Sequence, residues 1–131
     1  MKSIKIQNKY IPQSIEYLQG ISLCGAQSRV RSKVVRKLID ILEEMKTQEN
    51  ELIEEFTEKG DDGNPIMNEV YLKEHSLWMD EIAEVQIEDN HLSSLKDSLE
   101  NSEELLSGKN AEVYDVILDA IEKAAKQSSE L

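Results

Sequence analysis

The sequence predicts a mainly α protein of the α+β kind, with a long helical hairpin, a duplicated strand-helix-helix unit and a small two-stranded sheet. Three observations lead to this prediction. Apolar residues recur at helical spacing over most of the chain, two short stretches alternate apolar and polar residues, and the order strand, helix, helix occurs twice. The length of 131 residues suits one compact domain, so we expect a single domain over residues 1–131.

The first strand-helix-helix unit begins near the N-terminus. Residues 4–8 alternate apolar and polar side chains, as a strand with one buried face does. Pro12 then stands at a helix start, and Ile15 and Leu18 continue at helical spacing. We expect Gly25 to end this helix as a C-cap and a second helix to follow.

A second unit with the same layout starts at residue 85. Its strand and first helix match the first unit at an offset of 81, with Ile4 matching Val85, and Gly25 matches Gly108 at an offset of 83. We interpret residues 4–38 and 85–121 as an internal repeat. Chance similarity between two amphipathic stretches is the alternative, because apolar periodicity alone produces such matches.

Residues 39–84 are expected to form a helical hairpin that links the two copies. Apolar residues at heptad spacing, with Glu49 as one polar step, predict a helix from about Ala26 to Lys59, roughly 50 Å long. These seam residues are Val35, Leu38, Leu42, Met45, Leu52 and Phe56. Residues 60–65 break the helix in a tight turn. A shorter helix that carries Tyr71, His75, Trp78 and Ile82 then folds back, with His75 beside Trp78, and residues 126–131 are expected to fray.

Charge divides the chain into a basic head, residues 1–37, and an acidic body, residues 38–131. The head has eight Lys or Arg and one acidic residue, whereas the body has seven and twenty-six. The net charge of −12 argues against non-specific binding to nucleic acid or to a membrane surface by the whole molecule. The sequence has no apolar run of membrane-spanning length and no apolar signal stretch, so we expect a cytoplasmic protein. The single Cys24 agrees with a reducing compartment, and we expect it to be partly buried.

The basic cluster at the start of the long helix is a candidate anion site. A helix N-terminus favours an anion, and Arg binds phosphate bidentately. The residues proposed for this site are Ser28, Arg29, Arg31 and Lys33. The alternative is a solvated face, or pairing of these cations with Glu16 and the acidic body.

Acidic residues of the hairpin are candidates for binding a basic partner. They are Glu51, Glu54, Glu55, Glu58, Asp80, Glu81 and Glu84. If the two helices brought them together, they would instead form a carboxylate cage for Mg²⁺, as in all-helical nucleotide pyrophosphatases. The alternative is a solvated face. His75 and His91 have no Cys or His at ligand spacing, and we expect no catalytic residues, metal or cofactor.

Four segments, residues 4–13, 28–31, 61–65 and 107–115, together resemble a family of small proteins of unknown function from phages and prophages of Gram-positive bacteria. The resemblance covers nearly the whole chain. It implies a phage or prophage origin and a bacterial cytoplasmic setting, and it carries no catalytic residues over.

We therefore expect a non-enzymatic protein-interaction module, either a host-factor inhibitor or a phage accessory protein. Nucleotide or phosphate binding around Arg29 and Arg31 is the alternative, and an Mg²⁺-dependent nucleotide hydrolase is a third possibility. Exposed seam residues on so long a helix also predict a homodimer. Pairing of the basic head with the acidic body of a neighbouring subunit would explain the charge division without any ligand.

Overall fold

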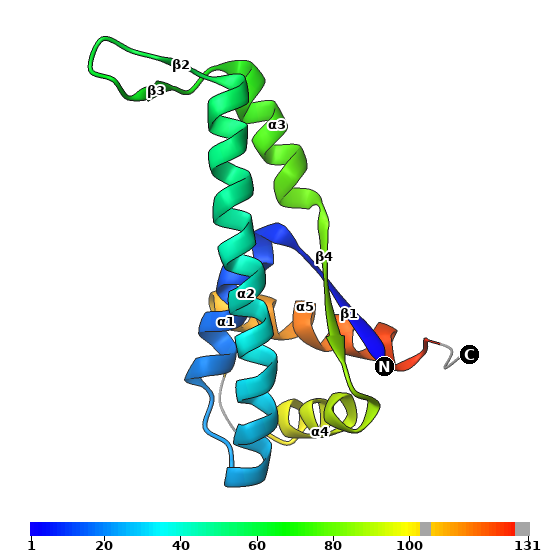
Figure 1. Ribbon diagram of the computed structural model, residues 1–131. Coiled ribbons are helices and arrows are strands. Elements are labelled where there is room, and N and C mark those ends of the chain that lie inside the picture. Colours follow the sequence, from blue (N-terminus) through cyan, green and yellow to red (C-terminus); the bar gives the residue numbers. More distant parts are fainter. Residues whose placement is uncertain (103–105, 128–131) are drawn as a thin grey trace.

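The computed structural model describes residues 1–102 and 106–127 and has a base from which a helical stalk protrudes (Figure 1). The described residues form five α-helices, a 3-10 helix and two small antiparallel sheets. The predicted fold class, mainly α with a small two-stranded sheet, is confirmed.

The base is built on the antiparallel pairing of β1 (Lys2–Gln7) with β4 (Ile82–Ile87). Ile4 lies opposite Val85, and both side chains are only 2% exposed. The alternation of residues puts most of the apolar side chains of both strands on one face, including Ile4, Ile6, Val85 and Ile87, whereas Ile82 lies on the other face and is exposed. Two short strands are marginally stable alone, so the helices that cover this face supply the rest of the core.

The sheet is covered by four α-helical segments and a short 3-10 helix. The 3-10 helix η1 (Asn8–Tyr10) leads into α1 (Ile11–Gly20), which has Pro12 in its first turn as predicted. After β4 come α4 (Asp89–Glu100) and α5 (Gly108–Ala125). The first half of α2 (Gly25–Phe56) completes the base. The largest side chains with almost no exposure come from α1, α2, β4, α4 and α5: Ile11, Leu18, Leu38, Ile87, Leu95, Leu99, Val113 and Ile121.

The two copies of the predicted repeat have the same order of elements, β1-α1-α2 and β4-α4-α5. With the offset of 81, the pair Lys2 and Ile87 corresponds to the pair Ala83 and Ile6, and both pairs occur in the sheet. Helix packing is exchanged in the same way, because α1 packs on α5 while α4 packs on α2. Exchanging the two copies therefore leaves the strand register unchanged. This is the relation expected of two copies related by an approximate twofold axis that passes between Ile4 and Val85. The duplication itself stays a prediction.

The predicted role of the paired glycines is wrong. Gly25 and Gly108 are the first residues of α2 and α5, whereas α1 ends at Gly20 and α4 at Glu100. Gly108 has a φ of 56°, in the left-handed region that favours glycine. The glycines do mark a position where one helix is separated from the next, but each of them begins the second helix of its copy and does not end the first.

The stalk consists of the second half of α2 and of α3 (Glu69–Asp80), which folds back along it (Figure 1). The long helix is confirmed, although it ends at Phe56 because Thr57 is extended. Asn68 joins the two helices: its Nδ2 donates to the carbonyl of Phe56 at 2.8 Å, and its Oδ1 accepts from the amide of Tyr71 at 2.8 Å. This side chain caps α3 and holds its start against the end of α2.

At the tip of the stalk, two-residue strands β2 (Glu58–Lys59) and β3 (Pro65–Ile66) form a small hairpin. The sequence predicts only a tight turn here. The Asp62 carboxylate accepts hydrogen bonds from the backbone and side-chain nitrogens of Asn64, which lower the pKa of Asp62. Ile82, predicted on the second hairpin helix, instead begins β4, because Glu81 is already extended.

Gln127 is held against β1, although residues 126–131 are predicted to fray. Its side-chain amide accepts from the Ser3 backbone nitrogen at 3.0 Å and donates to the Ser3 carbonyl at 3.0 Å, as a neighbouring strand would. Lys2 also donates to the Gln127 carbonyl. The prediction is therefore wrong for residues 126 and 127, and its remainder, residues 128–131, lies outside the described residues.

We expect Leu38→Ala to lower the free energy of unfolding by about 2 to 5 kcal/mol, because it removes a side chain that is 1% exposed at the junction of α2 with the core. Chemical denaturation measures this change. Leu72→Ala is the matched control, since Leu72 is 57% exposed, and it should change stability by less than about 0.5 kcal/mol. Equal effects of the two substitutions would contradict the described core.

Gln127→Ala should lower the free energy of unfolding by about 1 to 2 kcal/mol, because two part-buried hydrogen bonds to the backbone of β1 are lost. Hydrogen exchange at the Ser3 amide should become faster. Lys123→Ala, which removes an exposed side chain of α5 paired with Asp119, is the control and should leave Ser3 unchanged. Unchanged exchange at Ser3 in Gln127→Ala would contradict the contact.

Candidate functional site

The interface between α2 and α3 is filled by aromatic and polar pairs that hold the stalk together. Trp78 is buried, and its Nε1 donates to Gln48 Oε1 at 3.0 Å. His75 Nε2 lies 2.9 Å from Glu49 Oε2, and the His75 ring is 5.4 Å from that of Trp78. The predicted place of His75 beside Trp78 is confirmed. Burial, with a smaller contribution from Glu49, raises the pKa of Tyr71.

Because α3 lies over the seam of α2, the seam is closed within one chain. Met45 is buried, and Leu52 and Phe56 are half-buried. The apolar surface from which a homodimer is predicted is therefore largely covered. Dimerisation stays a prediction, without the exposed seam as its basis.

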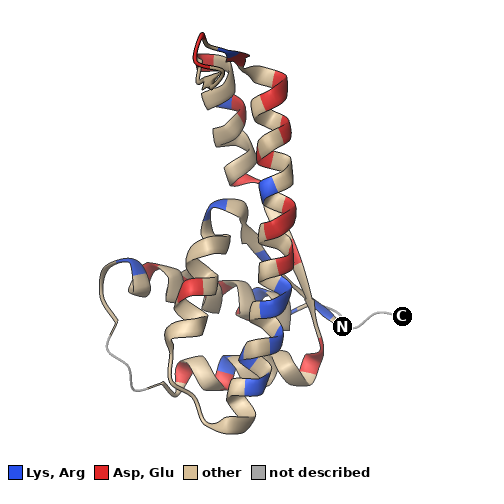
Figure 2. Ribbon diagram, turned by 60° about the vertical axis from the view of Figure 1, so that its left-hand side comes forward, with Lys and Arg blue, Asp and Glu red and all other residues tan. Residues whose placement is uncertain are grey.

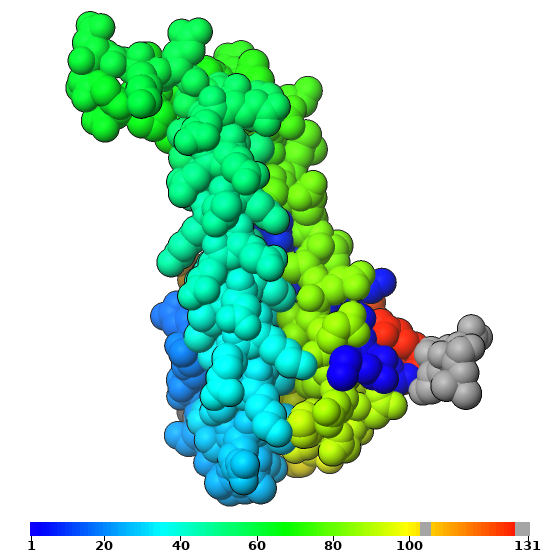
Figure 3. Space-filling view, viewed as in Figure 1, coloured from blue at the N-terminus to red at the C-terminus, as the bar shows by residue number. Residues whose placement is uncertain are grey.

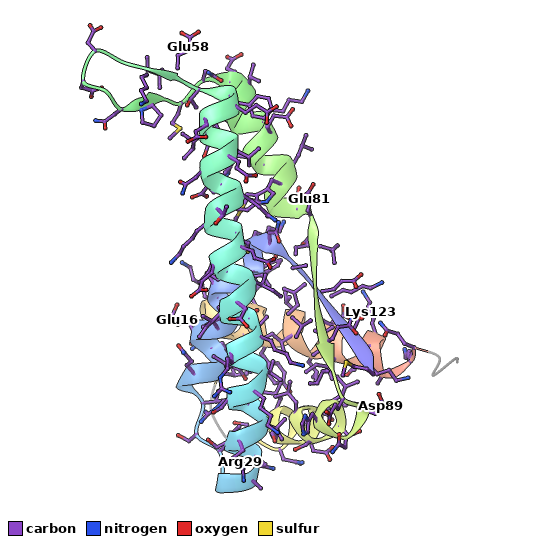
Figure 4. All side chains as sticks on the ribbon, in the orientation of Figure 1. Glu16, Arg29, Glu58, Glu81, Asp89 and Lys123 are labelled. Atoms are coloured by element: carbon purple, nitrogen blue, oxygen red, sulfur yellow. The ribbon has the colours of Figure 1, made fainter. Side chains whose placement is uncertain are left out.

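The acidic residues of the hairpin lie in two separate groups. The contacts of Glu49 with His75 and of Phe56 with Asn68 show that residues 51–58 lie beside the start of α3. Asp80 lies at the other end of α3, and Figure 4 shows Glu58 at the tip and Glu81 near the base. At 1.5 Å per residue of α2, the groups are separated by about 10 to 20 Å along the stalk.

The antiparallel hairpin keeps the two groups apart, so they do not form the carboxylate cage that was considered as an alternative. Asp80 instead accepts from Lys9 at 3.1 Å, a contact that raises the pKa of Lys9, and Glu84 lies 3.9 Å from Lys5 across the sheet. In residues 1–102 and 106–127, no group of three Asp, Glu, His or Cys side chains is placed to hold a metal ion.

The end of the stalk presents an apolar and acidic surface that was not predicted from the sequence. Ile66, Met67 and Val70 are between 50 and 57% exposed. A hollow of about 320 Å³ lies beside them, with Phe56 and Ile66 as apolar lining and Glu55 and Glu58 as acidic lining. We call this set the tip surface: Glu55, Phe56, Glu58, Ile66, Met67 and Val70. A signal was present in the sequence, since Ile66, Met67 and Val70 fall outside the row of Tyr71, His75 and Trp78 that faces α2.

Two of the four predicted anion ligands are used in holding the base together. Arg31 Nη1 donates to the carbonyls of Leu18, at 3.3 Å, and Ile21, at the end of α1, and its Nη2 donates to Ser28 Oγ at 2.9 Å. Arg31 thus satisfies carbonyls at a helix C-terminus, where a cation is favourable. Ser28 and Arg31 therefore have a structural role in the base, and the predicted anion site at these residues stays a prediction.

Arg29 and Lys33 remain exposed, and with Arg36 and Lys37 they form a row of cations along the first half of α2, which we call the basic row. In Figure 2 the part of α2 that lies in the base is blue at several positions, whereas the stalk is red at many positions, and red positions also occur on the helices of the base. Among the described residues, Arg29, Lys33 and Arg36 make no ion pair, so the alternative pairing with Glu16 does not occur within the chain. The prediction that Cys24 is partly buried is wrong: Cys24 is exposed, in the short segment that connects α1 to α2.

Comparison with models of known families, with curated proteins and with solved structures returns no match. None of the described helices is both long enough and apolar enough to cross a bilayer.

We expect Arg31→Met to lower the free energy of unfolding by about 1 to 3 kcal/mol, because the carbonyls of Leu18 and Ile21 lose their donor. Thermal or chemical denaturation measures the effect. Arg29→Met removes an equal charge from an exposed position and should change stability by less than about 0.5 kcal/mol. If the two variants were equally stable, Arg31 would not have the structural role described.

Proposed function

We propose that this chain is a non-enzymatic protein-interaction module that binds a basic protein partner with its tip surface. The observation that carries the proposal is the combination of exposed apolar side chains and unpaired acids at the end of a protruding stalk. Following the resemblance to phage proteins, we place it in the cytoplasm of a bacterial host, as a host-factor inhibitor or a phage accessory protein.

The chemistry of the tip surface suits a Lys or Arg side chain of the partner. The aliphatic part of such a side chain would lie on Phe56 and Ile66, and its charged end would meet Glu55 or Glu58. Met67 and Val70 add exposed apolar area beside the hollow. Burial of that area contributes affinity, while the acids contribute selection for a basic surface.

Protrusion of the stalk favours this surface for binding. In the space-filling view the stalk stands clear of the base, so a partner can approach the tip from several sides (Figure 3). The further acids of the stalk, Glu51 and Glu54 on α2, are also exposed. Two stalks placed side by side would repel each other, so a partner with a basic surface fits better than the stalk of a second copy.

Capture from a lysate of a Gram-positive bacterium, followed by direct binding measurements with each purified candidate, tests the proposal. The wild-type chain should retain a basic protein, and Glu55→Lys with Glu58→Lys should weaken its binding by at least about tenfold, because like charges then meet. Ile66→Ser should weaken it through loss of apolar contact. All these positions are solvent-exposed, so the variants should unfold at the wild-type temperature.

The matched control reverses two charges on the base, Arg29→Glu with Lys33→Glu, and should leave this binding unchanged. Equal affinity of wild type and tip variants for every captured protein would contradict the proposal. Loss of binding only in the base variant would also contradict it. If the captured protein is a second copy of this chain, and both the tip and the base variants disrupt that complex, the basic row of one copy pairs with the stalk of the other.

A further inference from the structure

We infer that the hollow between α2 and the start of α4 binds the phosphate group of a small anionic ligand. The hollow has a volume of about 280 Å³ and lies on the base, at the opposite end of α2 from the tip surface. Three cations of the basic row line one side of it, and the β4-α4 corner lines the other. The residues concerned are Lys33, Arg36, Lys37, Ile87, Glu88 and His91.

Helical spacing brings the three cations to the same hollow. Lys33, Arg36 and Lys37 are three and four residues apart, so they project from adjacent turns of one face of α2. Lys37 Nζ donates to the Gln86 carbonyl, which holds this ammonium at the edge of β4. The cations are thus placed by two elements of the base and can converge on one group.

The lining of the hollow also includes apolar side chains. Val34 and Ile87 are nearly fully buried and belong to the core beneath it. Bidentate hydrogen bonds from Arg36 and point charges from the two lysines suit phosphate oxygens. The apolar lining offers contact to the remainder of a small ligand.

The charges of the hollow leave one cation in excess. Asp40 and Glu88 also line it, and His91 Nδ1 lies 3.9 Å from Glu88 Oε2. Lys33 and Arg36 make no ion pair within the described residues, so Asp40 and Glu88 offset their mutual repulsion only in part. A bound phosphate would relieve it.

The net charge of the chain favours a small ligand over a nucleic acid. Repulsion by the acidic stalk is screened beyond about 8 Å at physiological ionic strength, so a single phosphate compound meets mainly the local cations. A polyanion would extend past the hollow toward further acids of α2, such as the exposed Glu43 and Glu44. The inferred site shares Lys33 with the site predicted from the sequence, and it contains Arg36 and Lys37 in place of Ser28, Arg29 and Arg31.

Titration of the full chain with inorganic phosphate, pyrophosphate and ATP, followed by amide chemical shifts in NMR, tests the inference. At least one probe should bind with saturation at millimolar concentration, and the shifts should be centred on Ile87, Glu88 and His91. Lys33→Gln with Arg36→Gln should weaken binding by about tenfold or more, because two charged hydrogen-bond donors are lost. Lys46→Gln with Lys73→Gln, which removes the same charge from the stalk, should leave affinity unchanged.

Several results would overturn the inference. These are the absence of saturable binding of all three probes to the wild-type chain, equal loss of affinity in the stalk control, or binding of a single-stranded oligonucleotide without binding of the small probes. Lys33→Arg with Arg36→Lys conserves the charges and should retain most of the affinity, which separates ligand contact from damage to the fold. If the double Gln variant does not fold, the shift map of the wild-type chain decides the question.

Discussion

Ile4 and Val85, far apart in the sequence, face each other in the pairing of β1 with β4, and the rest of the molecule depends on that pairing. It closes the chain into one base and brings α1 against α5 and α4 against α2, while the second half of α2, the hairpin at the tip and α3 extend from the base and return to it. Because two short strands cannot persist alone, the sheet and its helical cover stabilise each other. The stalk is the segment of chain left between two strands that must be neighbours.

Periodicity in the sequence was sufficient to predict the elements of the base and the long helix. Alternation over residues 4–8 and heptad spacing from Val35 to Phe56 report burial on one face, and the structure buries those faces. The same signal failed at Ile82, four residues after Trp78, where the spacing continues but the backbone is already extended. Periodicity describes which side chains are buried, and a residue at the junction of two elements satisfies both patterns.

The candidate sites were less predictable because they depend on which segments meet. The acids around Glu54 and Glu81 suggested a cage, yet an antiparallel hairpin places each residue of α2 beside one stretch of α3 only. Arg31 has the kind of side chain expected of an anion ligand, but it donates instead to the backbone carbonyls at the C-terminal end of α1. No local pattern reports either fact. The tip surface and the hollow on the base could be located only once the path of the chain in three dimensions was known.

Since α2 is one uninterrupted helix of 32 residues, the basic row and the tip surface cannot approach each other. The stalk is mainly acidic, whereas the base carries charges of both signs together with the basic row, so the molecule has an electric dipole along the stalk (Figure 2). The field of a charged partner exerts a torque on this dipole. The molecule therefore turns its stalk toward a basic surface and its base toward an anionic one. The field extends over about one Debye length, roughly 8 Å in physiological salt, so alignment takes place in the last stage of the encounter.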